Sequence, residues 1–100
     1  MREVSDVSFT PDAVRQYKKL PKAVRTRLKQ AVRAHLVEAD PTQPTRNKFR
    51  LRRASAFADY ELRVEPWRVF YRFDDGRVLV TLIGEKRGAS LVVEGEELRL

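Results

Sequence analysis

Four basic side chains in the second half of the sequence have the types and spacing to act on a phosphate group. Arg63 and Arg68 occupy outward positions of two alternating segments, and Lys86 and Arg87 follow Gly84 at the end of a third. RNA can be cut without a metal when a base takes the 2′-hydroxyl proton, an acid protonates the leaving oxygen, and cations stabilise the phosphorane. These four cations are the predicted catalytic residues, with the two arginines holding the phosphate.

The proton transfers require a group that titrates. Lys86 lies among arginines, and nearby like charges lower the pKa of an amine, so Lys86 is a candidate acid or base. Tyr60 and Tyr71 are further candidates, but the alternating pattern places both rings on the core face. Trp67 could stack on a base, yet its pattern favours the core. His35 falls on the apolar stripe of a predicted helix, so we expect a packed histidine.

The composition narrows the chemistry further. The chain has no cysteine and one histidine, which excludes disulfides and thiol catalysis and argues against a zinc site. We expect no metal and no cofactor. No segment approaches the roughly 20 consecutive apolar residues that cross a bilayer, and residues 1–6 lack the apolar core of a signal peptide. The expectation is a cytoplasmic protein without a membrane partner.

The net charge of +7 is concentrated in one part of the chain. Residues 13–53 hold 13 Lys or Arg against 2 acidic residues, so the remainder sums to −4. Such segregation is typical of a surface for phosphate backbones or for an acidic protein partner, although it can also serve solubility alone. The residues that we expect to bind RNA are Lys22, Arg25, Lys29, Arg33, Arg46, Lys48, Arg50 and Arg53.

Alternation of apolar and polar residues predicts a sheet with one apolar and one cationic face. The segment at 74–76 supplies a tight turn because its glycine accepts a positive φ. The strand that follows, 78–83, is apolar on both faces, which is typical of a central strand. The predicted strands are residues 4–9, 60–65, 67–73, 78–83 and an edge strand at 88–93, with an acidic tail at 94–97.

Two helices are predicted before these strands. Thr10 is a good N-cap and Pro11 suits the first helical position, so a first helix runs from 11 to about 19. A second helix from 21 to about 39 has an apolar stripe and a basic outer ridge. In residues 46–53, basic residues alternate with Phe49 and Leu51, which could pack while the cations face outward. The sequence predicts one α+β domain over the whole chain: a helical hairpin on a mostly antiparallel sheet of about four strands.

The ordered blocks Tyr60-Glu-Leu-Arg-Val-Glu-Pro-Trp-Arg68-Val-Phe-Tyr71 and Val80-Thr-Leu-Ile-Gly84-Glu-Lys86-Arg87 resemble the RelE/ParE superfamily of toxins. The resemblance runs from Phe9 to the end of the chain. It implies the toxin of a type II toxin–antitoxin system, in a hetero-oligomer with its cognate antitoxin. The antitoxins of this superfamily generally wrap the toxin with a flexible segment.

The ribosome-dependent endonucleases of this superfamily cut mRNA with basic residues on the sheet and a tyrosine near the C-terminus. Arg63, Arg68 and Lys86 or Arg87 match the basic positions, so the resemblance implies a metal-independent mRNA endonuclease that contacts mRNA and ribosomal RNA on the ribosome. Two residues depart from the pattern. Glu61 replaces a frequent lysine, and Val92 stands about where the late tyrosine is expected.

Two alternatives remain open on the sequence. In the other branch of the superfamily, the same scaffold binds DNA gyrase and poisons it without cutting RNA, and both departures favour this binder. The third possibility is a basic module that is no longer toxic and that persists as a partner of its antitoxin.

Overall fold

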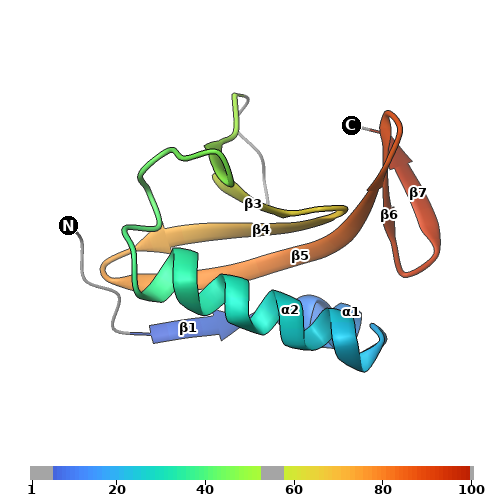
Figure 1. Cartoon of the computed structure of the whole chain (residues 1–100), viewed down its shortest axis with the longest axis horizontal. Helices are drawn as coiled ribbons and strands as arrows, with labels where there is room; N and C mark the ends of the chain where they lie inside the picture. The colour runs from blue at the N-terminus through green and yellow to red at the C-terminus, as the bar shows by residue number, and fades with distance from the viewer. Residues whose placement is uncertain (1–5, 53–57, 100) are drawn as a thin grey trace.

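The computed structural model describes residues 6–52 and 58–99 and has two helices on one face of a large sheet (Figure 1). The elements in chain order are β1 (Asp6–Phe9), α1 (Pro11–Lys18), α2 (Lys22–Val32), the π-helix η1 (Arg33–Val37), β2 (Lys48–Arg50), β3 (Tyr60–Val64), β4 (Trp67–Asp74), β5 (Arg77–Arg87), β6 (Ser90–Val93) and β7 (Glu96–Arg99). The α+β class and the N-terminal helical hairpin are confirmed. The sheet has seven strands among the described residues, rather than about four.

The start of α1 follows its sequence signals. The Thr10 side chain accepts a hydrogen bond from the Ala13 amide at 3.1 Å, and Pro11 takes the first helical position. The second helix differs from the prediction at its end. It changes to the wider π-helix η1 from Arg33 and ends at Val37 instead of about Ala39.

The main core lies between the helices and one face of the sheet. Leu28 and Leu36 from the second helical segment pack in one buried cluster with Leu62, Val69 and Tyr71 from β3 and β4. The predicted apolar face of the central hairpin is therefore confirmed. This cluster fixes which face of each strand is turned away from the helices, and so it positions the candidate site.

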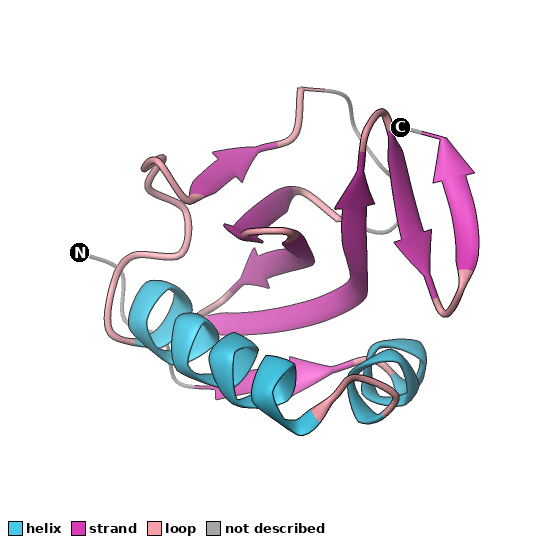
Figure 2. Cartoon of the chain, turned by 45° about the vertical axis from the view of Figure 1, so that its right-hand side comes forward, coloured by secondary structure: helices cyan, strands magenta, loops and turns pink. Residues whose placement is uncertain are grey.

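Strand β5 is the central strand of the sheet, as predicted, and it has three partners. It pairs along its length with β4, while its first half pairs in parallel with β1 and its last three residues pair with β6. The sheet order is β2-β3-β4-β5-β6-β7, with β1 beside β5. Figure 2 shows β5 turning sharply along its length, so that β6 and β7 rise from the plane of the other strands.

Position 84 needs glycine because there is no room for a side chain, and not because of its backbone conformation, since its φ is not positive. A Cβ atom there would lie 2.9 Å from both Cγ and Cδ1 of Leu91 and 3.0 Å from the Val92 carbonyl oxygen. Real Cβ atoms do not approach their neighbours so closely. The side chain of Leu91 therefore packs directly on the backbone of β5, in the space that a side chain at position 84 would occupy.

A second, smaller cluster lies on the sheet face opposite the helices. Phe70 of β4 packs there with Ala58, Leu91 and Val93, and Leu51 and Leu82 lie against it. The prediction that this face is cationic and exposed is wrong at Phe70 and Arg68, which are both buried. The cause of this burial is the pair of strands β6 and β7. The predicted edge strand is an inner strand, and the predicted acidic tail forms a turn and the outer strand β7.

We predict that Gly84→Ala destabilises the protein by about 1–3 kcal/mol, because the added methyl group must displace Leu91 or the backbone of β6. Urea unfolding measures the difference. Gly88→Asn is the control, since no atom lies within 4 Å of a Cβ at Gly88 and asparagine tolerates its φ of +56°. An unchanged unfolding midpoint for Gly84→Ala would contradict the packing argument.

Candidate functional site

The structure brings three of the four predicted catalytic cations to one corner of the sheet. Arg63 of β3 is the register partner of Arg68 of β4, and Arg68 is the register partner of Gly84 of β5. The Lys86 amide donates a hydrogen bond to the Pro66 carbonyl oxygen at 2.7 Å. The end of β5 therefore lies beside the turn between β3 and β4, and the predicted neighbourhood of Arg63, Arg68 and Lys86 exists.

The two arginines that were expected to hold a phosphate already have partners within the chain. Arg68 is only 7% exposed, and its guanidinium lies 3.1 Å from the Glu65 carboxylate and donates to the Trp67 carbonyl oxygen at 3.0 Å. Arg63 donates to the Glu61 carboxylate at 2.7 Å and lies 3.9 Å above the Phe49 ring. Glu61 is one of the two departures from the endonuclease pattern, and in the structure it neutralises a predicted phosphate ligand.

The two cations at the end of β5 are also paired. The Lys86 ammonium donates to the Gly88 carbonyl oxygen, and Arg87 lies 2.6 Å from the Glu85 carboxylate. Arg87 and Lys86 are adjacent in a strand, so their side chains leave opposite faces of the sheet. The catalytic role of these four residues stays a prediction, and a phosphate would compete with a carboxylate at three of them.

Lys86 is the candidate proton-transfer group at this corner, whereas Tyr60, Tyr71 and His35 lie on the helix side of the sheet, away from it. The Tyr71 hydroxyl donates to the Pro41 carbonyl oxygen at 2.6 Å, and burial raises the pKa of Tyr71. Tyr60 stacks on Tyr71 at 5.4 Å and accepts a hydrogen bond from Arg50 at 3.1 Å. His35 is partly buried, and its desolvation, together with the charge of Lys48, lowers its pKa. These side chains have structural roles in the main core and at its edge.

The predicted RNA-binding residues are divided between surface and interior. Arg25 is partly buried and donates to the Lys18 carbonyl oxygen at 3.3 Å. Arg53 lies outside the described residues. The remaining side chains of this set, apart from Lys48, are exposed: Lys22, Lys29, Arg33, Arg46 and Arg50.

Lys48 is a correction to the predicted RNA-binding set. It is 3% exposed, and its ammonium donates to the carbonyl oxygens of His35 at 3.0 Å and Asp40 at 2.7 Å. Burial lowers the pKa of Lys48. In the register of β2 with β3, Lys48 pairs with the buried Leu62, so Lys48 faces the core and Phe49 faces the other way. The Lys48 ammonium therefore binds backbone carbonyl oxygens at and just after the end of the second helical segment, and it is not exposed at the surface where RNA could bind.

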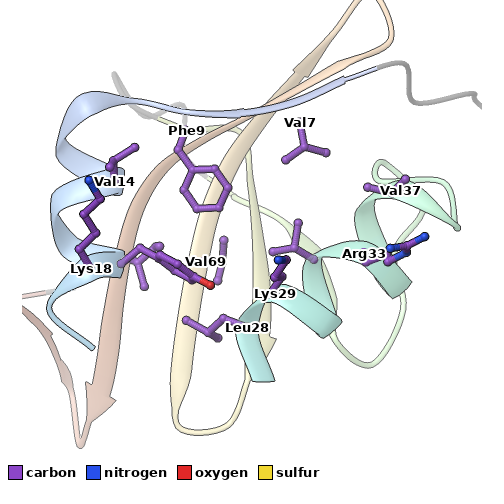
Figure 3. Close-up of a pocket in the computed structure, with 12 residues that line it drawn as sticks. Val7, Phe9, Val14, Lys18, Leu28, Lys29, Arg33, Val37 and Val69 are labelled. Carbon is purple, nitrogen blue, oxygen red and sulfur yellow. The ribbon is translucent and has the colours of Figure 1, made fainter. Parts of the chain in front are cut away.

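A groove lies on the helix side, between α1, α2 and the sheet (Figure 3). This groove has a volume of about 600 Å³ and a mostly apolar lining, with Lys18, Lys29 and Arg33 as its charged members. Val37 at its wall is 39% exposed. The lining residues are Val7, Phe9, Val14, Tyr17, Lys18, Leu28, Lys29, Val32, Arg33, Val37, Val69 and Ile83.

Sequence reasoning missed this groove, although one signal for it was present. The apolar stripe that was assigned to the core included Leu28 and Val32. Each is followed directly by a basic residue, Lys29 and Arg33 respectively. A helix whose apolar stripe and cationic ridge adjoin can line a groove with both. The pattern could not show that the short α1 leaves part of that stripe uncovered.

Sequence reasoning also missed Glu94, which was assigned to an acidic tail. Its carboxylate lies 2.7 Å from Arg15 and 3.2 Å from Lys19, both near the end of α1. Hydrogen bonding to Arg15 is the main cause that lowers the pKa of Glu94 to about 2. In residues 6–52 and 58–99, no cluster of three or more His, Asp or Glu could hold a metal ion, and no helix is long and apolar enough to span a membrane.

Comparison with known proteins places this architecture in a family. The family model of the ParE toxin of the parDE type II toxin–antitoxin system matches residues 7–89. No curated protein matches the chain. The matched segment runs from β1 through the whole of β5, and it ends before β6 and β7. The chain therefore belongs to the ParE family of type II toxin–antitoxin toxins, whose partner is a cognate antitoxin.

Proposed function

We propose that this toxin acts by binding DNA gyrase and not by cutting mRNA. The observation that carries the proposal is the state of Arg68, the central predicted phosphate ligand. Its guanidinium is buried, it donates to the Trp67 carbonyl oxygen, and it lies against the Glu65 carboxylate, so a phosphate would have to displace contacts that the chain already makes. A toxin that poisons gyrase by binding needs no catalytic acid or base and no phosphate-binding group. The burial of Arg68 is therefore compatible with this function.

Charge pairing at the same corner supports the binding function. Charge-assisted hydrogen bonds are among the stronger ones in proteins, and cleavage would require Arg63 and Arg68 to exchange their carboxylates for a phosphate. Cleavage would also require proton transfer, and position 92 is valine in place of the late tyrosine. Gyrase is the target in the branch of the RelE/ParE superfamily that does not cut RNA, and the chain belongs to the ParE family.

Ribosome-dependent cleavage of mRNA is the second candidate, and one observation favours it. Arg63 and Arg68 are register partners, and the hydrogen bond from the Lys86 amide to Pro66 holds Lys86 at the same corner. If the carboxylates moved aside, three cations would meet one phosphate. Catalysis would then depend on Arg68, whereas gyrase binding through an exposed surface would not.

We predict that the purified toxin inhibits DNA supercoiling by gyrase and that Arg68→Met inhibits it within about threefold of wild type. Methionine keeps the buried aliphatic bulk of Arg68, so the surface of the toxin is preserved. Supercoiling of relaxed plasmid at increasing toxin concentration measures the half-inhibitory concentration. Unimpaired gyrase at saturating wild-type toxin, with cleavage of ribosome-bound mRNA that Arg68→Met abolishes, would overturn the proposal.

We further propose that the antitoxin places an amphipathic segment with acidic side chains in the groove between α1 and α2. An unfilled apolar groove of this size is typical of helix-in-groove recognition. The cations Lys18, Lys29 and Arg33 at the groove favour a segment that carries carboxylates beside its apolar residues. The groove lies on the sheet face opposite Arg68, so an antitoxin segment here leaves that corner uncovered.

Charge reversal at the groove tests the position of the antitoxin. We predict that Lys29→Glu combined with Arg33→Glu weakens antitoxin binding at least tenfold at physiological salt, because like charges then face each other at the interface; about 1.4 kcal/mol suffices for that change. Titration calorimetry with the purified pair measures the dissociation constant.

The matched control is Lys22→Glu combined with Arg46→Glu, which makes the same change in net charge at exposed positions outside the groove lining. We expect the control to bind the antitoxin within about threefold of wild type, since long-range charge is screened beyond roughly 8 Å at this salt concentration. Equal weakening by the two double variants would show that only total charge matters and would remove the groove from the proposal.

A further inference from the structure

We propose that β6 and β7 form a hinged cover over Arg68, fastened to α1 by Glu94, and that release of this fastening exposes Arg68 to solvent. The cover is the hairpin of residues 90–99. It lies outside residues 7–89, the segment that the ParE family model matches. The inference does not depend on gyrase or on mRNA as the target.

The cover meets the sheet beside Arg68. Arg68 pairs in register with Gly84, and the Leu91 side chain of β6 occupies the space where position 84 would carry a Cβ. Arg68, Gly84 and Leu91 are thus lateral neighbours at the inside of the bend. Phe70, two residues along β4, packs in the same buried cluster as Leu91 and Val93. The hairpin therefore packs on the face of the sheet that carries Arg68, directly beside it.

Glu94 at the tip of the hairpin fastens it to the helical layer. The Glu94 carboxylate accepts hydrogen bonds from Arg15 at 2.7 and 3.0 Å and lies 3.2 Å from the Lys19 ammonium. Its side chain is 20% exposed, less than either cation. Arg15 follows the N-terminal turn of α1, which is held by the buried Ala13 of the main core. One carboxylate thus links the hairpin to the body of the fold.

The other attachments of the hairpin run through β6, in which Ser90, Leu91 and Val93 are buried. Strand β6 pairs with only three residues of β5, and the second cluster has four buried members among the described residues. The turn between β5 and β6 contains Gly88 at a φ of +56°, and no atom lies within 4 Å of where its Cβ would be. A glycine with free space around it can absorb the backbone change of a hinge. Segments with few buried contacts open at the lowest cost.

Labelling of arginine side chains with phenylglyoxal, followed by peptide mass spectrometry, tests the cover on the purified free toxin. A buried guanidinium reacts with phenylglyoxal only while the cover is open. Its labelling rate is therefore proportional to the fraction of molecules with an open cover. In wild type we expect Arg68 to react more slowly than the half-exposed Arg63. Glu94→Gln should speed the labelling of Arg68 several-fold, because the fraction of molecules with an open cover rises when the contact with Arg15 and Lys19 is weakened. Arg63 should keep its rate.

The matched control is Glu96→Gln, which removes the same charge from an exposed position on the same hairpin. It should leave the labelling of Arg68 within about twofold of wild type, as expected of an exposed charge. Arg15→Gln breaks the contact from the side of α1 and should act like Glu94→Gln, so the test does not depend on the folding of one variant. Hydrogen exchange of the β6 amides should speed up in both variants while α2 stays protected.

Two results would overturn the proposal. If Arg68 keeps its wild-type labelling rate in both Glu94→Gln and Arg15→Gln, the contact does not close a cover over Arg68. If Glu96→Gln speeds the labelling as much as Glu94→Gln does, the acceleration reflects the charge of the hairpin and not the contact with α1.

Discussion

The packing of Leu91 on the backbone of Gly84 is the constraint on which the rest of the structure depends. Strand β5 pairs with β1 through its first four residues and with β6 through its last three, and β4 pairs along most of its length. The absence of a side chain at Gly84 allows Leu91 to pack on the backbone there. The bend of β5 brings β6 and β7 onto the sheet face opposite the helices, and this packing turns an expected open cationic face into a partly apolar corner.

The two faces of the sheet therefore differ in polarity and in how their charges are paired. On the helix side, the main core leaves an apolar groove with cations among its lining, which suits a protein segment of opposite charge. On the other side, Arg63 is paired with a carboxylate of its own strand, and Arg68 is paired with a carboxylate of the turn between β3 and β4. Arg68 in particular is bound by the chain itself. The antitoxin segment proposed for the groove would therefore bind on the face opposite Arg68.

Much of the fold could be predicted because its signals are local. Alternation placed Tyr60 and Leu62 on the core face, and the cap formed by Thr10 and Pro11 set the start of α1. Residues 46–53 show the limit of this reasoning. Alternation identifies the two faces of a strand but cannot say which face meets the core. Lys48 was therefore expected outside, but it lies inside, where two backbone carbonyl oxygens accept hydrogen bonds from its ammonium group.

The candidate site was harder to predict because it depends on contacts between distant segments. The neighbourhood of Arg63 and Arg68 followed from antiparallel pairing and is present. Their ion pairs with Glu61 and Glu65 were within two or three residues in the sequence, yet a pattern cannot distinguish a hydrated charge from a paired one. The contact of Glu94 with Arg15 joins residues 79 positions apart, and no local signal indicates it.

The central claim is that the cations of the corner are held by the chain itself and do not cut RNA. Mapping the 5′ ends of cellular transcripts after induction of the toxin tests this claim most directly. If the toxin acts by binding, growth stops with gyrase-linked DNA breaks and without new transcript ends in phase with codons. Codon-phased ends that appear with wild type and vanish with Arg68→Met would contradict the claim.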